Sequence, residues 1–303
     1  MKATSVTGRL GRNAALVLLS LVVVAPLAAQ RLELGARPEL LLPGLVSTEA
    51  SEVRITWSPD GSRMLWGSIN RPGGPGGWEI WESVREKDGW STPHPASFDS
   101  PENDFDPSFA PDGRGLFFFS NRPGGLGGDD LWYVPFDPAT GQYGVAVNLG
   151  AGVNSKGDEW APVAAAGGTR LLFASDGRGG RGRHDLFVSA LREGRWSDAE
   201  PVAGELNSAE DDFDATYLDD GETLVFTRRV GEQDGADLYV AFAHDGRYGA
   251  AQRLDARVNA PGSWNLGPSL RPGERGFLYF TSHRDGESAG RLDLYRVSCE
   301  VRR

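Results

Sequence analysis

Acidic side chains recur along this 303-residue chain at nearly constant intervals. The recurring positions, here called the acidic column, are Glu52, Asp104, Glu159, Asp212 and Asn265, separated by 52, 55, 53 and 53 residues. Carboxylates gathered around one point repel one another, so either some of their pKa values rise or a cation lies among them. We therefore expect the acidic column to ring one mouth of an axial channel and to bind a ligand there.

The fifth unit would give this ring one distinct side. Asn265 replaces the acid, and Trp264 stands where the other units have Ser51, Asn103, Asp158 and Asp211. An indole ring at the mouth could stack on an apolar or sugar face of a ligand. Two alternatives stay open: Trp264 as ordinary packing, and the acids as acceptors of backbone hydrogen bonds where each strand begins. A divalent cation could lie among the acids; no other cofactor is expected, and the sequence indicates no particular metal.

Residues beside the acidic column are apolar or irregular. The apolar column is Val53, Phe105, Trp160, Phe213 and Leu266, which alternation places on the opposite face of each strand, packed between repeats. Asp106, Asp158, Asp211 and Asp214 add negative charge nearby, but their repeat positions also hold Ala161 and Gly267. The four histidines, His94, His184, His244 and His283, fall at different repeat positions and are expected to be surface residues.

Two further columns combine opposite charges in every unit. Arginines follow the second predicted strand at Arg71, Arg122, Arg178, Arg229 and Arg284, and acids open the third at Glu79, Asp130, Asp185, Asp237 and Asp293. Guanidinium geometry suits a carboxylate, so we expect structural pairs that brace the glycine-rich loop between them. The alternative is a ring of anion-binding arginines.

The elements that carry these columns are short strands. In the second unit they are predicted at 105–109, 115–120, 130–135 and 143–149, with a turn at Pro111-Asp112-Gly113. Aromatic and aliphatic runs bounded by Gly, Pro, Asn and Asp are typical of strands, and no sustained helical period is present. Four-stranded units at this spacing predict a β-propeller.

Five such units are present, at about 47–98, 99–153, 154–206, 207–258 and 259–301. The last unit lacks a fourth strand. The segment 38–46 (PELLLPGLV) resembles 201–206 (PVAGEL), which precedes the turn at 219–221 in the fourth unit. We predict an all-β fold: a single five-bladed β-propeller domain of four-stranded blades over 31–303, its ring closed by an N-terminal strand from 38–46. Such closure leaves no open sheet edge at the seam.

The first thirty residues have the order of a secretory signal peptide: three basic residues, an apolar run over 14–25, then Pro26 and Leu-Ala-Ala-Gln. Its removal would leave 28 basic and 42 acidic residues, a net charge of −14. With no cysteine at the junction, we expect a cleaved, periplasmic or secreted bacterial protein that is not a lipoprotein and does not insert into a membrane; the alternative is an uncleaved anchor. The acidity disfavours nucleic acid as a partner, and we expect a monomer.

Several segments carry a family resemblance. The chain reads SNRPGGLGG at 120–128, NSKGDEWAP at 154–162 and NSAEDDFD at 207–214. These resemble the WD-like β-propeller repeat of the TolB type, over about residues 38–301. The resemblance implies a propeller in the bacterial periplasm or cell envelope, and it leaves no room for the α/β domain that precedes the propeller in TolB itself.

The sequence indicates the function less directly than the fold. The only cysteine is Cys299, and no catalytic motif is present. We expect a non-catalytic binding or scaffold propeller of TolB-like type that engages an envelope protein or glycan. The alternative is a carbohydrate-active enzyme, a glycoside hydrolase or lyase with axial carboxylates; a third possibility is a propeller that works beside a separate hydrolase.

Overall fold

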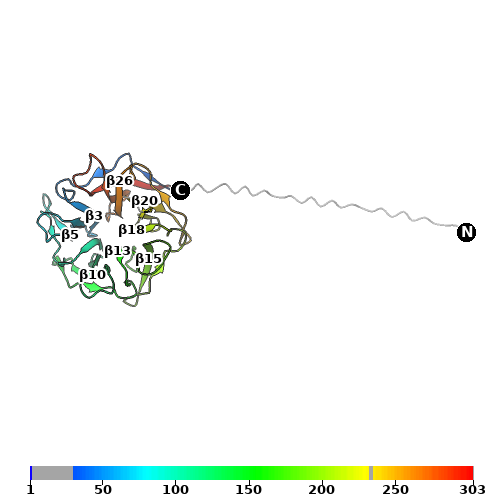
Figure 1. Ribbon diagram of the computed structural model, residues 1–303, viewed down its shortest axis with the longest axis horizontal. Helices are drawn as coiled ribbons and strands as arrows, with labels where there is room; N and C mark the ends of the chain where they lie inside the picture. Colours follow the sequence, from blue (N-terminus) through cyan, green and yellow to red (C-terminus); the bar gives the residue numbers. More distant parts are fainter. Residues whose placement is uncertain (2–29, 232–234, 303) are drawn as a thin grey trace.

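The computed structural model describes residues 1, 30–231 and 235–302. Over these residues the chain is all-β, with five blades arranged around a central axis (Figure 1). The predicted fold class is confirmed. The predicted signal peptide falls almost wholly on residues 2–29, which lie outside the described residues. Within the described part of the chain, no helix has the length and apolar character needed to cross a membrane.

Three main strands run outward from the axis in each blade. From the first blade to the fifth they are β3 (Ser51–Trp57), β4 (Arg63–Ile69) and β5 (Trp78–Glu86); β8 (Asp104–Phe109), β9 (Gly115–Ser120) and β10 (Asp130–Asp137); β13 (Glu159–Ala164), β14 (Arg170–Ser175) and β15 (Asp185–Arg192); β18 (Asp211–Tyr217), β19 (Leu224–Arg229) and β20 (Asp237–Ala241); and β24 (Trp264–Ser269), β25 (Phe277–His283) and β26 (Asp293–Arg302). The innermost strands contact one another in the cyclic order β3, β8, β13, β18, β24 and back to β3.

The outer strands are short. They are β6 (Gly89–Trp90) and β7 (His94–Pro95) in blade 1; β11 (Gln142–Tyr143) and β12 (Val147–Asn148) in blade 2; β16 (Arg195–Trp196) and β17 (Glu200–Pro201) in blade 3; and β23 (Gln252–Arg253) in blade 4, beside the hairpin of β21 (Ala243–His244) and β22 (Arg247–Tyr248). Strands β21 and β22 pair with each other, and each of the others pairs with the third strand of its blade, so the fourth strand is the shortest part of the repeat.

The N-terminal segment closes the ring. Strand β2 (Glu39–Leu40) pairs with β26, opposite Arg296 and Tyr295, inside the predicted range 38–46. Strand β1 (Arg31–Leu34), which was not predicted, also pairs with β26, with Leu34 opposite Cys299. Leu34 is buried in the core between the fourth and fifth blades, so the alternation of RLEL gives this strand its buried face.

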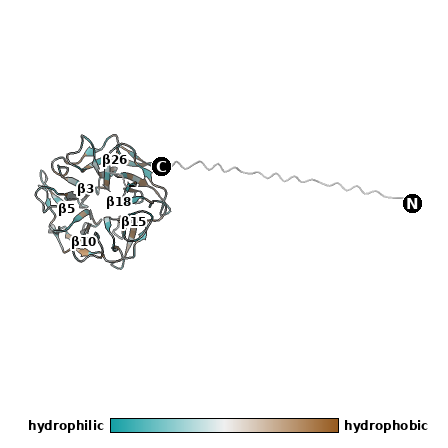
Figure 2. Ribbon diagram, in the orientation of Figure 1, coloured by the Kyte–Doolittle hydropathy of each residue, from teal (hydrophilic) through white to brown (hydrophobic). Residues whose placement is uncertain are grey.

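The core consists of apolar side chains packed between neighbouring blades. One cluster contains Val53 from blade 1, Phe105 from blade 2 and Phe173 from blade 3. Another joins Phe213 and Phe226 of blade 4 with Leu172 of blade 3. The predicted packing of the apolar column is confirmed, and Figure 2 shows the brown, hydrophobic residues on the strands of the blades.

Every innermost strand contains an irregularity at the same repeat position, here called the bulge column. Its residues are Arg54, Asp106, Ala161, Asp214 and Gly267, with φ values of 46°, 52°, 51°, 49° and 51°. The register of each innermost strand shifts at this point. A β-bulge adds one residue and redirects its side chain, so the bulge column leaves the alternation that governs the rest of the strand.

Candidate functional site

The bulge column places three charged side chains on the axis. Arg54 Nη2 of blade 1 donates to the carbonyl of Ala215, 3.3 Å away in the non-adjacent blade 4. Asp214 Oδ2 accepts from the Gly267 amide of blade 5 at 2.9 Å. Arg54, Asp106 and Asp214 are all buried. The three residues, here called the axial triad, therefore fill the centre of the ring.

Burial controls the ionisation of the two carboxyls. It raises the pKa of Asp106 well above its ordinary value, and the charge of Asp214 raises it further, while Arg54 opposes the shift. Burial also raises the pKa of Asp214, against the guanidinium of Arg54 and the Gly267 amide. One cation thus faces two acids, and burial favours the neutral form of both carboxyls. Asp106 Oδ1 and Arg54 Nη1 have no hydrogen-bond partner among the described residues.

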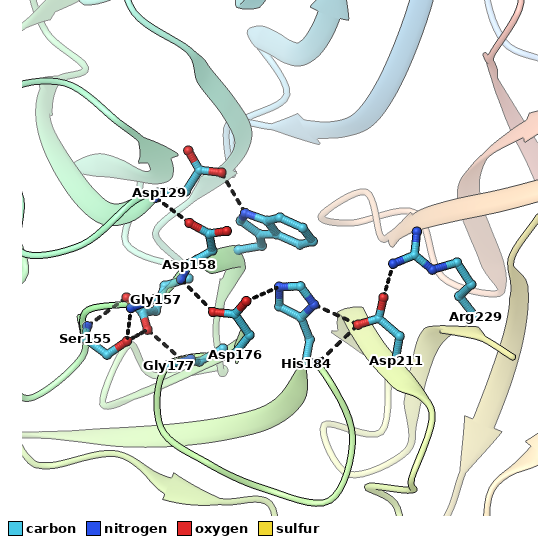
Figure 3. A network of polar contacts seen from close by, with 12 residues as sticks. Asp129, Ser155, Gly157, Asp158, Asp176, Gly177, His184, Asp211 and Arg229 are labelled. Atoms are coloured by element: carbon cyan, nitrogen blue, oxygen red, sulfur yellow. Dashed lines mark hydrogen bonds and ion pairs between the residues drawn. The ribbon is translucent and has the colours of Figure 1, made fainter. Parts of the chain in front are cut away.

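A second group of polar side chains lies where strand ends and loops of blades 2 to 4 adjoin, a region here called the mouth (Figure 3). His184 is buried, and its Nδ1 lies 2.7 Å from Asp211 Oδ1. Arg229 donates to the other oxygen of Asp211. Burial opposes ionisation of Asp211, but hydrogen bonds from His184 and the charges of His184 and Arg229 lower its pKa overall. Asp211 is therefore a compensated carboxylate.

Three further acids at this mouth have much less compensation. The Asp129 amide donates to Asp158 Oδ1 at 2.9 Å, and the Asp158 amide donates to Asp176 Oδ1 at 2.8 Å. Within the described residues, Asp129 and Asp158 form no ion pair, and Asp176 approaches only His184 Nε2, at 3.9 Å. Burial raises the pKa of Asp129, helped by the charges of Asp158, Asp130 and Asp176. We call Asp129, Asp158 and Asp176 the acidic cluster.

Aromatic rings divide the mouth into two sides. Trp160 stacks on His184 with ring centroids 4.1 Å apart and donates from Nε1 to Asp129 Oδ2 at 2.8 Å. At the position equivalent to Asp129 and His184, Leu292 of blade 5 and Trp78 of blade 1 are apolar, as is Ala236 of blade 4. Trp78 is 38% exposed. The mouth is acidic over blades 2 to 4 and apolar over blades 5 and 1.

The predicted ring of acids does not lie at this mouth. All five residues of the acidic column are buried inside the blades. Asp104 accepts from the Ser100 amide and hydroxyl at 2.5 and 2.7 Å, and Glu159 and Asp212 do the same with Ser155 and Ser208. The alternative of acids that accept backbone hydrogen bonds where the strands begin therefore describes their contacts. Their binding of a ligand stays a prediction.

The acidic column is buried because of the geometry of a propeller blade. Side chains of a strand stand on the two faces of its sheet, and both faces of each blade pack against neighbouring blades. The innermost strand therefore turns its backbone edge, not its regular side chains, toward the axis. Burial raises the pKa of Glu52 to about 7, despite hydrogen bonds from Thr48 and the charge of Arg71.

The predicted arginine–acid pairs are wrong in their partners. Arg122 Nη2 bonds Asp104 of the acidic column at 2.6 Å and the Phe98 carbonyl at 3.2 Å, not Asp130. Arg71, Arg178 and Arg284 likewise donate to carbonyls of the segment that leads into their own or the neighbouring inner strand. In blade 4 this role belongs to Arg228, which bonds Asp212, so Arg229 was the wrong member of the pair. The arginines therefore clamp connecting segments.

The acids that open the third strands instead hold the glycine-rich loops. Asp130 and Asp185 accept loop amides from Gly127 and Gly182, both at 3.2 Å, and Asp293 accepts the Gly290 amide at 3.0 Å. Glu79 accepts the Gly76 amide, whereas Asp237 pairs with Arg253 at 2.7 Å. A carboxylate can satisfy several loop amides at once, which explains why these loops need no arginine.

One more structural column was not predicted. Asn154, Asn207 and Asn259 each accept the amide and donate to the carbonyl of the second residue of a third strand, such as Leu131. Blade 1 has Asp99 at this position, which only accepts from the Ile80 amide, at 3.1 Å. Burial raises the pKa of Asp99 to about 9, helped by the charge of Asp104.

Two predicted single residues can now be placed. Trp264 begins β24 opposite His283 and is partly buried, next to Gly235. The prediction that His184 is a surface residue is wrong, because it is enclosed by Trp160 and Asp211. Its Nε2 has no hydrogen-bond partner in the described part of the chain. No group of three or more His, Cys, Asp or Glu side chains among the described residues has the arrangement of a metal site.

Comparison with known proteins gives the fold. Neither the models of known protein families nor the curated proteins match the sequence. TolB from Acinetobacter baumannii aligns with a TM-score of 0.49 and 16% identity over 84% of this chain, which spans 56% of that protein. A structure described as TolB from Agrobacterium tumefaciens aligns with a TM-score of 0.51 and 13% identity, over 84% of this chain and 92% of its own.

Enzymes share the same architecture. The catalytic domain of the GH62 α-L-arabinofuranosidase from Coprinopsis cinerea aligns with a TM-score of 0.51 and 10% identity, over 88% of this chain and 97% of its own. Likeness at these identities defines a fold and not an activity. The chain is a five-bladed β-propeller with an architecture that TolB structures and a glycoside hydrolase also have.

Proposed function

We propose that this protein is a non-catalytic binding propeller of the bacterial cell envelope, and that its axial mouth captures a cationic group of an envelope protein or glycan. The observation that carries the proposal is the acidic cluster, in which Asp129 and Asp158 have no cationic partner among the described residues while the neighbouring Asp211 has two. Partly enclosed carboxylates in an acidic protein attract and orient positive groups.

The location rests on two supports. The first thirty residues have the order of a signal peptide, and the fold is like that of TolB structures. We propose that the export signal is cleaved and that the mature domain works in the periplasm or outside the cell, as a monomer with one propeller.

A second candidate function, glycan cleavage, has one observation in its favour. Asp106 and Asp214 are axial carboxyls with raised pKa values, as a general acid requires. Both are buried, however, and Arg54 occupies the space between their blades. The acids of the acidic cluster are only partly buried, so binding there fits the accessible groups better. Release of reducing ends from a panel of envelope and plant polysaccharides, lost in Asp106→Asn, would favour catalysis instead.

The test of binding removes the charge that the proposal uses. The double variant Asp129→Asn with Asp158→Asn would be compared with the wild-type protein for binding of chitosan oligosaccharides and of a tri-lysine peptide, and for cross-linked capture of partners from envelope extract. We expect the variant to bind about tenfold more weakly, and wild-type binding to fall with added salt.

A matched control separates the site from overall charge. The double variant Asp88→Asn with Asp245→Asn removes two carboxylates from exposed turns of blades 1 and 4, and should leave binding unchanged. If neither probe nor extract distinguishes the double variant from the wild-type protein, the acidic cluster is not the binding site. If the control weakens binding equally, the attraction is diffuse and the mouth has no special role.

A further inference from the structure

The outer edge of blade 2 carries two exposed valines, which no other outer edge of the described chain has. Strand β12 pairs with β10 on one side and, within the described part of the chain, has no neighbouring strand on the other. Val145 and Val147 on this edge are 83% and 51% exposed, while Ala146 between them packs into the core of the blade. Alternation thus places two β-branched side chains outward along an unpaired strand edge.

The positions equivalent to Val145 and Val147 are polar or charged in blades 1, 3 and 5, and in blade 4 they are Ala250 and Gln252, so no other blade has a β-branched apolar residue there. Val147 corresponds to His94, Glu200, Gln252 and Glu39, and Val145 to Thr92, Asp198, Ala250 and Arg37. Proline follows or precedes the strand residue in blades 1, 3 and 5, at Pro95, Pro201 and Pro38. Charges and prolines are the usual protection of exposed edges. Blade 2 lacks both between Tyr143 and Asn148.

A groove runs beside this edge, between blades 2 and 3. It has a volume of about 960 Å³, and Val147 lies on its rim. Its aromatic lining comes from Phe117, Tyr133 and Trp196, with the Phe117 ring 5.1 Å from Tyr133 and 6.0 Å from Trp196. The only charged lining residues are Asp112 and Arg195, so the groove is close to neutral in a chain of net charge −11.

We propose that this edge accepts an extended segment of a partner polypeptide as an added strand, with uncharged apolar side chains at alternate positions directed into the groove. In this mode of recognition, main-chain hydrogen bonds to a free edge give affinity, and pockets for alternate side chains give specificity. The near neutrality of the groove matches an uncharged segment. This binding surface is separate from the axial mouth.

A second folded copy fits the edge less well than a free segment. Pairing of two β12 edges would join only two-residue strands, far short of the roughly 1,000 Å² that a stable interface needs. The strand of a second copy is also backed by its own blade and cannot enter the groove. The occupant is therefore a flexible loop or tail of another protein.

The experiment selects seven-residue peptides from a displayed random library on the wild-type protein, and measures the selected peptides on variants. We expect alternating apolar sequences that bind about tenfold more weakly to Val147→Glu, because a buried valine contact is lost and a charge is placed on the edge. The control Val230→Glu makes the same change at another exposed valine and should bind normally. Equal melting temperatures would show that the variants are folded.

Backbone methylation tests strand addition directly. N-methylation of the alternate peptide amides that face β12 should abolish binding, whereas methylation of the opposite set should leave it intact. The proposal is overturned if no peptide is enriched, if selected peptides bind Val147→Glu as well as wild type, or if both methylated sets bind. It is also overturned if the wild-type protein dimerises in sedimentation and Val147→Glu does not, because the edge would then serve a second copy.

Discussion

The acidic column and the bulge column lie two residues apart on the same five strands, yet their surroundings are opposite. The acidic column keeps its chemistry in four of five blades, and each member is buried among donors of its own blade. The bulge column changes from Arg54 to Asp106, Ala161, Asp214 and Gly267, and its charged members meet across the axis. Repeated chemistry in this propeller marks the structure of a blade, and varied chemistry marks the shared centre.

Among the variants that test this comparison, Asp104→Ala should lower the free energy of unfolding most. It removes the partner of Arg122 and the acceptor of the Ser100 amide inside blade 2. Breaking a buried ion pair on one side costs about 3–5 kcal/mol, so the free energy of unfolding in urea should fall by that amount. Asp285→Ala, which removes an almost fully exposed carboxylate, should change it by less than about 0.5 kcal/mol. Similar losses in the two variants would contradict a structural role for the acidic column.

A smaller loss is expected from Arg54→Met, which leaves the axial triad without its cation. The loss should be about 1–3 kcal/mol near neutral pH, because the Ala215 carbonyl then lacks its donor and the two buried carboxyls lack the nearby positive charge. Since the pKa values of Asp106 and Asp214 are already raised by burial, the native state binds more protons than the unfolded state. Stability should therefore increase as pH falls from neutral toward about 4, more steeply in the variant than in wild type. Parallel pH profiles would show that Arg54 does not compensate these acids.

Asp99→Asn tests a repeated position where one blade departs from the others. The pKa of Asp99 is raised to about 9, so this group favours the native state fully below the unfolded value near 4 and loses that contribution as pH rises toward 9. Asparagine would restore the donor found in Asn154 and should stabilise the protein by about 1 kcal/mol at pH 8. Unfolding measured at pH 4 and pH 8 should show a flatter pH profile. If the variant were less stable than wild type at pH 8, Asp99 would not be equivalent to Asn154 and the other asparagines at this repeat position.

The smallest expected effect is at Ala161, a buried non-glycine residue at φ 51° in the bulge column. Ala161→Gly should raise the free energy of unfolding by about 0.5 kcal/mol, because relief of the left-handed conformation slightly exceeds the entropy that glycine loses. The reverse change, Gly267→Ala, should lower it, since the added Cβ would lie 3.0 Å from Arg54 Cβ. Thermal unfolding of both variants would measure these changes in stability. Changes of the same sign in the two variants would argue against a common bulge geometry.

Much of the fold was accessible from the sequence, because the acidic column and the acids that open the third strands recur at nearly constant spacing in all five units. Two adjacent arginines, Arg228 and Arg229, hid the register of the fourth blade, since either one satisfies the pattern. The strand at Arg31–Leu34 was missed because four residues next to an expected signal peptide carry little periodicity.

The site was less accessible for a physical reason. Arg54, Asp106 and Gly267 share no side-chain chemistry, and only a positive φ makes them equivalent. A signal was present in the spacing, because each lies two residues after the acidic column. The buried His184 could not be recognised from its own repeat position; only its contact with Trp160 and Asp211 shows its role.

Closure of the ring by the first strand has a consequence for the folding reaction. The ion pair between Arg302 and Glu33 joins residues 269 positions apart, and the last blade is incomplete until the two ends of the chain meet. Forming contacts at such separation requires closing a loop that contains nearly the whole domain, which slows folding more than it lowers stability. Until that step, the outer edge of β26 remains open to other chains. The slowest phase of refolding should therefore be the docking of residues 31–40, and an excess of a peptide with that sequence should compete with it.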